Sequence, residues 1–287
     1  MSLRTNEIMY SIIRNTDLIN CGQQLINFAD IVYKEKNRTT LVKHFYESLH
    51  QWASFDIFGD LLNNNDKKNY FICNDTNAVR IFLLLRLPRE TSTVKTIKEI
   101  KAFGEYILAN YTKPIGNCIS EDSLESILQF LEREYGFLSK VFSKNKTFFI
   151  RMHNSHKEYN GECLTTIKDD NIINHIFLYH MKNNDIINPE PVLFHELGHT
   201  LHTRCFGNVD IIPDYVIDIL QDICFPSIKE LSIDIQQELF ADALSIGLMY
   251  KTPYEKYDFF IDRISKNQRE GLKMLVEKIL ENISCKN

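Results

Sequence analysis

The sequence lacks the paired cysteines of a disulfide-stabilised secreted protein. Its seven cysteines are odd in number and widely scattered, and no two of them form a CxxC pair. Such a pattern indicates reduced thiols in a cytosolic protein rather than a disulfide framework. The residues are Cys21, Cys73, Cys118, Cys163, Cys205, Cys224 and Cys285.

Long apolar runs are also missing. The longest run, Ile81 to Leu85, is far shorter than the ~18 residues that a membrane helix needs. The N-terminal segment 1–20 has neither an uninterrupted apolar core nor a small-residue cleavage site, so it does not resemble a signal peptide. These absences predict a cytoplasmic protein that is neither exported nor anchored in a membrane.

Strong positive charge is the third absence. No long run of Lys or Arg occurs, and the formal net charge is −5. Binding to the phosphate backbone relies on clustered positive charge, and no helix-turn-helix pattern is visible. We therefore expect no nucleic acid partner.

The composition is otherwise that of a globular protein. With 287 residues and 44% apolar residues, the chain can form one large domain or two ordinary ones. Apolar spacing predicts helices within 5–60 and 95–111, whereas 70–87 is ambiguous between strand and helix. Pro114 and Gly116 make the best candidate boundary, which predicts a mainly helical N-terminal region over 1–115.

The pattern after this boundary predicts an α+β domain over 116–287. A helix is expected over 124–142, because apolar residues recur there at helical spacing. Three short runs rich in aromatic and β-branched residues follow and predict a small sheet. These runs are Thr147–Met152, Glu162–Ile167 and His175–His180.

The segment that carries the chemistry is NPEPVLFHELGHTLHTRCFGN, residues 188–208. Asn188 can cap a helix that runs from about 191 to 206, and Gly207 can end it. His195 and His199 then lie one turn apart on one face, so both imidazoles can bind one zinc ion. Glu196 is rotated away from His195, where it can accept a proton from a zinc-activated water.

A catalytic zinc needs a third protein ligand, and a second helical stretch over 229–250 offers one. Glu238 and Asp242 are four residues apart on one face of this stretch, beside the small residues Ala241 and Ser245. Rival acidic ligands lack this combination of helical context, a second acid and small neighbours. They are Asp210, Asp214, Asp218 and Glu230.

Two further residues of the motif helix are weighed as ligands. Cys205 stands where a metzincin has its third histidine, but its position favours packing. His202 would close the site and make it structural if it were a fourth ligand, although a packed or supporting role is favoured.

These residues resemble the gluzincin branch of the zincin-like metallopeptidases, whose third ligand comes from an ExxxD pattern. Glu238 and Asp242 match that pattern. The resemblance implies that Glu238 binds zinc and that Asp242 orients a liganding imidazole, that of His195. The string FHELGHTLH (194–202) is also similar to the active-site helix of oligoendopeptidase and thimet-oligopeptidase families, and to that of ImmA/IrrE-type regulators.

The resemblance implies zinc-dependent hydrolysis of a peptide or protein substrate. Gluzincins polarise the substrate carbonyl with Tyr, His or Arg, and Tyr215 is our first candidate, followed by Tyr250 and Tyr254. His180 is a further residue that could line the cleft. The peptide is expected along an edge strand, with 175–180 as the candidate.

Two alternatives remain open at this point. The first is a catalytically inactive or regulatory binding protein of zincin fold, with a structural or lost metal. The second is a DNA-linked regulator that cleaves a repressor. The intact Glu196 argues against the first, because a structural zinc site needs no such carboxylate.

Overall fold

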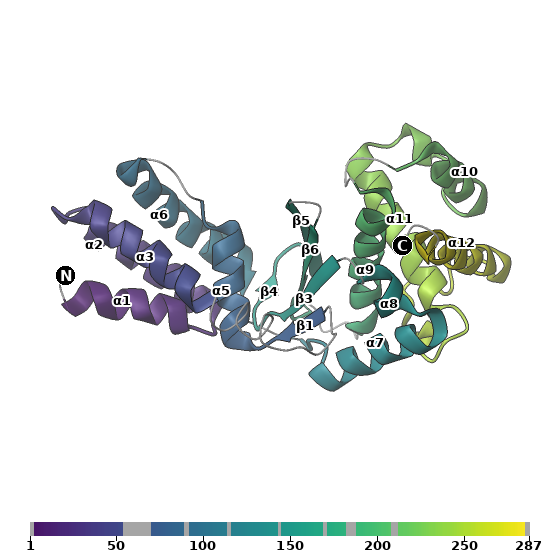
Figure 1. Cartoon of the computed structure of the whole chain (residues 1–287), viewed down its shortest axis with the longest axis horizontal. Helices are drawn as coiled ribbons and strands as arrows, with labels where there is room; N and C mark the ends of the chain where they lie inside the picture. The colour runs from purple at the N-terminus through teal and green to yellow at the C-terminus, as the bar shows by residue number, and fades with distance from the viewer. Residues whose placement is uncertain are drawn as a thin grey trace.

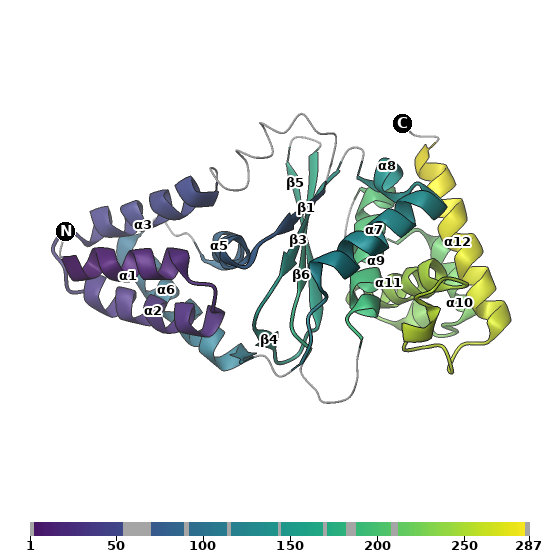
Figure 2. The same ribbon diagram turned by 90° about the horizontal axis from the view of Figure 1, so that it is seen from below.

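A computed structural model of the chain describes residues 3–53, 70–88, 92–113, 116–142, 145–168, 171–181, 188–207 and 212–284. The molecule has three layers, in which a four-stranded sheet separates two groups of helices (Figure 1). The N-terminal helices cover one face of the sheet and the C-terminal helices cover the other, as the view from below also shows (Figure 2). The predicted α+β class, with a small sheet and mostly helical content, is confirmed.

The N-terminal layer contains the helices expected within 5–60 and 95–111. Asp17 begins one of them, because its side chain accepts hydrogen bonds from the backbone N–H groups of Ile19 and Asn20. Residues 54–60 of the expected helical region lie outside the described residues. The helices are α1 (Leu3–Arg14), α2 (Leu18–Val32), α3 (Arg38–Ala53), α5 (Asp75–Arg86) and α6 (Thr93–Asn110).

The ambiguous stretch 70–87 contains both a strand and a helix. Strand β1 (Tyr70–Cys73) is followed by α5, and the side chain of Asn74 caps this helix by accepting from Asn77 N–H. Strand β1 pairs with a strand that lies after residue 116. The sheet therefore takes strands from both sides of the predicted boundary, and the division into two units stays a prediction.

The three predicted strands are present as β3 (Asn145–Arg151), β5 (Gly161–Lys168) and β6 (Asn171–Leu178). The strand order is β1-β3-β6-β5, with β5 antiparallel to β6 and the other pairs parallel. A separate two-stranded ribbon joins β2 (Tyr111–Thr112) to β4 (Ser155–His156).

The expectation that 175–180 forms an edge strand is wrong. Strand β6 pairs with β3 on one side and with β5 on the other, and it ends at Leu178. Strands β1 and β5 are the edge strands of this sheet, and helix α9 packs against β5. Pairing order is set by the long-range contacts of the sheet, which alternation within a single strand does not reveal.

The sheet is apolar on both faces because helices cover both. Phe149 and Ile176 belong to the C-terminal hydrophobic core, whereas their neighbours Phe148 and Phe177 belong to the N-terminal one. Side chains alternate between the two faces of a strand, so one short apolar run contributes to both cores.

The C-terminal layer contains α7 (Glu121–Tyr135), α8 (Phe137–Val141), α9 (Glu190–Phe206), α10 (Asp214–Ile223), α11 (Ile233–Met249) and α12 (Lys266–Ser284). Gly136 has a left-handed backbone (φ 62°) and divides the helix expected over 124–142 into α7 and α8. Helix α9 is where the sequence predicts it and ends at Gly207. Its first turn follows Pro189 with no side-chain cap, so the predicted cap at Asn188 is wrong.

Two general features follow from the described residues. None of their helices has the length and apolarity needed to cross a membrane. None of the six described cysteines is in a disulfide bond.

Helices α9 and α11 are in backbone contact at Gly198. A Cβ atom at this position would lie 2.8 Å from both the Cα and the carbonyl oxygen of Ala241. The glycine therefore allows the two helices to approach more closely than side chains would permit.

We predict that Gly198→Ala lowers the free energy of unfolding by about 1–2 kcal/mol, because overpacking outweighs the helix-propensity gain. Urea denaturation of the purified variant measures this change. Gly271→Ala in α12 is the matched control, since its Cβ would lie 3.2 Å from Cδ1 of Ile223, a side-chain tip that can move. Equal stability of the two variants would contradict a backbone contact at Gly198.

Candidate metal centre

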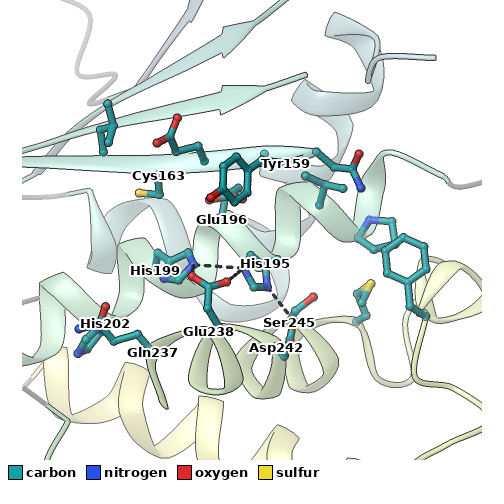
Figure 3. A pocket seen from close by; sticks show the side chains of 18 of the residues that line it. Tyr159, Cys163, His195, Glu196, His199, His202, Gln237, Glu238, Asp242 and Ser245 are labelled. Carbon is teal, nitrogen blue, oxygen red and sulfur yellow. Dashed lines mark hydrogen bonds and ion pairs between the residues drawn. The ribbon is translucent and has the colours of Figure 1, made fainter. Parts of the chain in front are cut away.

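Three residues from two helices bring their ligand atoms together. The Nε2 atoms of His195 and His199, one turn apart on α9, are 3.1 Å from each other. Glu238 of α11 places Oε2 3.2 Å from Nε2 of His195 and Oε1 3.5 Å from Nε2 of His199 (Figure 3). Their potential ligand atoms all lie within 4.8 Å of one another.

This donor set fits a zinc ion. Ligand atoms of a tetrahedral zinc site lie about 3.4 Å apart, because each is about 2.0–2.1 Å from the ion. The separation of 3.1 Å between the two Nε2 atoms and that of 3.2 Å between Oε2 of Glu238 and Nε2 of His195 are close to this value. Two imidazoles and one carboxylate also leave the fourth position open, as a catalytic zinc requires.

Asp242 orients the first histidine. Its Oδ1 is 2.8 Å from Nδ1 of His195, which leaves Nε2 of His195 facing the ligand cluster. Burial opposes protonation of His195, but hydrogen bonds to Asp242 and Glu238 outweigh it and raise its pKa to about 10. Burial and the charge of His195 lower the pKa of His199.

Glu196 is buried beside the cluster and is only 3% exposed. Its Oε2 has no hydrogen-bond partner among the described residues, and burial raises its pKa to about 8. Across from it, a Cβ atom at Gly161 would lie 2.6 Å from its Oε1. Gly161 therefore leaves the space that the carboxylate occupies, a role that the sequence did not indicate.

The cluster lies in a cavity of about 650 Å³, the metal-site cavity. Strand β5 and the residues before it form one wall, from Glu158 to Thr165. Helices α9 and α11 form the other, and residues 258–260 close one end. The open edge of the sheet and the metal ligands thus share one cavity.

The rival ligands do not join the cluster. Asp218 forms an ion pair with Lys229 at 2.5 Å, and Asp214 and Glu230 are exposed side chains outside the group of three. Asp210 lies outside the described residues.

The two other candidates of the motif helix take packing positions. His202 is 2% exposed, and its ring packs against Phe206 and Phe240. It lines the metal-site cavity but is not in the ligand cluster. Cys205 packs against the C-terminal core.

The structure does not bring the predicted tyrosines to the cavity. Tyr215 is 51% exposed and lines a separate cavity of about 380 Å³ near α12. Tyr250 is buried below Arg269, and Tyr254 packs on Phe194. None of the three lines the metal-site cavity, so we correct the assignment of Tyr215.

Tyr159 is the tyrosine that does line the metal-site cavity. Figure 3 shows it beside Glu196, on the wall opposite the zinc ligands. Tyr159 comes just before strand β5. The sequence would have indicated this tyrosine if β5 had been identified as an edge strand. His180 instead bonds to the backbone, with Nδ1 3.0 Å from the carbonyl oxygen of Gly116.

Comparisons of the chain with protein-family models, with curated proteins and with solved structures found no match. The resemblance to gluzincins therefore depends on the motif residues and on their geometry.

We predict about one zinc ion per chain, held by the three ligands. Glu238→Ala should lose zinc nearly as completely as His199→Ala, because each removes a ligand atom. Asp242→Asn should weaken zinc affinity by only about 10–100-fold, because Asp242 contacts His195 and not the ion. Elemental analysis and a competitive chelator titration measure both effects.

Glu230→Ala is the matched control, since Glu230 is an exposed acid near the start of α11. Its zinc content should equal that of the wild type. Zinc retention by Glu238→Ala, or zinc loss in Glu230→Ala, would contradict the ligand assignment.

Proposed function

We propose that the chain is a zinc-dependent metallopeptidase of the HExxH type with a zincin-like catalytic domain. The observation that carries this proposal is the convergence of His195, His199 and Glu238 beside the buried Glu196 in one cavity. Helix α9 with the motif, helix α11 with Glu238 and the edge strand β5 all line this cavity, which supports the proposal.

Glu196 favours hydrolysis over a purely structural metal site. A buried carboxylate without a hydrogen-bond partner costs free energy, so its place in the cavity calls for a chemical role. His195, His199 and Glu238 would hold a zinc ion, which would supply a Lewis acid and lower the pKa of a water molecule toward neutrality. Glu196 lies beside these residues, where its carboxylate would accept a proton from water and pass it to the leaving amine.

Strand β5 offers the binding edge for an extended peptide. Among the described strands it pairs with β6 alone, so its outer backbone groups can pair with a substrate strand. The cavity follows β5 from Gly161 to Thr165. A peptide at this edge would run past Glu196, which lies opposite Gly161.

Tyr159 takes the role for which the sequence suggested Tyr215. Its backbone N–H donates to Nδ1 of His156 at 3.1 Å, and its ring stacks on the His156 ring at 4.8 Å. The loop before β5 is thereby anchored while the tyrosine side chain stays 54% exposed. A phenol on this wall can donate a hydrogen bond to the carbonyl oxygen as negative charge develops.

We predict that Glu196→Gln abolishes peptide cleavage and keeps both zinc and fold. The amide fills the same space but cannot accept a proton from water. Cleavage of a mixed peptide library, followed by mass spectrometry, measures activity, and elemental analysis measures zinc. An undiminished cleavage rate would exclude Glu196 as the base.

We predict that Tyr159→Phe lowers kcat about 100-fold, because the variant loses one hydrogen bond to the developing oxyanion. Zinc content should not change, and KM should change little. Tyr215→Phe is the matched control and should keep wild-type kcat, since Tyr215 lines a different cavity. If the two variants are equally active, Tyr159 has no such role.

A further inference from the structure

The metal-site cavity has two distinct ends, because α9 and α11 run antiparallel. His195 meets Asp242 and His199 meets Glu238, so earlier residues of α9 lie beside later residues of α11. Val192 of α9 and Met249 of α11 therefore line one end. Residues 258–260 line the same cavity, and the charge of Asp242 acts on Asp258. The beginning of β5 faces the same end, because a Cβ atom at Gly161 would lie 2.6 Å from Cγ1 of Val192.

Apart from its histidines, the ionisable side chains that line the cavity are acidic. Among the described residues no Lys or Arg lines it, and the carboxylates are Glu158, Glu162, Glu196, Glu238, Asp242 and Asp258.

Four of these carboxylates already have a role or a partner. Glu238 and Asp242 belong to the metal centre, Glu196 is the proposed base, and Glu162 forms an ion pair with Arg86 of α5. Glu158 and Asp258 remain. Both line the cavity, Glu158 just before the start of β5, and neither forms an ion pair within the described part of the chain.

Asp258 is a buried carboxylate on the wall of the cavity and is 5% exposed. Its Oδ1 accepts a hydrogen bond from the backbone N–H of Phe260 at 2.8 Å, which fixes the side chain. Burial raises the pKa of Asp258, and the charge of Arg269 opposes this only in part, because Arg269 also forms an ion pair with Glu255. A cationic partner in the cavity would stabilise the ionised carboxylate.

The same end also offers apolar surface. Met249 and Phe260 line it, and Phe259 is 46% exposed beside them. A long cationic side chain needs such a surface for its methylene groups, with the charge placed at a carboxylate. Acidic and apolar residues are thus combined in one subsite.

We propose that this end of the cavity binds a cationic group of the peptide substrate, with Asp258 and Glu158 as its partners. The group is the side chain of Lys or Arg or a free amino terminus, which share the same charge and N–H donors. The assignment rests on the proposed peptidase function, because it gives that cavity a substrate preference.

The test begins with cleavage of a tetradecapeptide library by the zinc-loaded protein and identification of the cut bonds. We expect Lys or Arg enriched at one fixed position, or cuts at one fixed distance from a free amino terminus. Acetylation of the amino termini alone distinguishes these two results. It abolishes a preference for a free amino terminus and leaves a preference for Lys or Arg unchanged.

Matched substrates then measure the contribution of Asp258. For a lysine preference, peptides with Lys or the uncharged norleucine at the selected position are compared; for an amino-terminal preference, free and acetylated peptides are compared. Asp258→Asn should lower kcat/KM for the cationic peptide about 10–100-fold, and for the uncharged one less than about threefold. Asn can still accept from Phe260 N–H, so the fold should be kept. Asp262→Asn, an exposed acid nearby, is the control and should keep the wild-type preference.

A binding experiment separates the failure of this inference from failure of the proposed function. The same library is passed over immobilised Glu196→Gln protein, and retained peptides are identified before and after acetylation of all amino groups. Enrichment of cationic peptides without cleavage by the wild type would support the subsite and refute the peptidase. Cleavage without positional preference, or equal losses for both matched peptides in Asp258→Asn, would refute the subsite and leave the peptidase standing.

Discussion

The close contact between α9 and α11 places every ligand atom of the metal centre. Gly198 lies against the backbone of Ala241, and this contact sets the distance between the helices. Glu238 and Asp242 can reach His195 only because the two helices are this close, in antiparallel register. A shift of either helix by a fraction of a turn would separate ligands that now lie within 4.8 Å of one another.

The burial of several carboxylates is the second constraint on the site. The metal-site cavity contains the carboxylates of Glu196, Glu238 and Asp242, and burial raises the pKa of Glu196 to about 8. Buried carboxylates are stable when a cation neutralises them. A divalent ion at the ligands and a cationic group at Asp258 would do so, one in the centre of the cavity and one at its end. The proposed metal site and the proposed cationic subsite thus share one electrostatic requirement.

The N-terminal helices support the wall of the cavity that faces the candidate metal ligands. Arg86 of α5 donates to Glu162 of β5, and the hydroxyl of Tyr179 donates to the same carboxylate at 3.2 Å. This network lies on the edge strand itself, next to Gly161 and its contact with Glu196. The N-terminal layer is therefore connected to the cavity through β5, although it supplies no metal ligand among the described residues.

The sequence by itself determined the helix with His195 and His199, the three main strands and the helix with Glu238. It could do so because the apolar spacing of each element is a local property. An i, i+4 pair shares a helix face wherever the helix forms, so the two-histidine arrangement required no knowledge of the fold. Only the tertiary structure decided that Glu238, 43 residues from His195, lies on the same cavity. It also decided that β5 is the edge strand beside the cavity. It placed Tyr159, and not Tyr215, on the cavity wall. These outcomes depend on which distant segments pack together, and spacing within one segment carries no information about that.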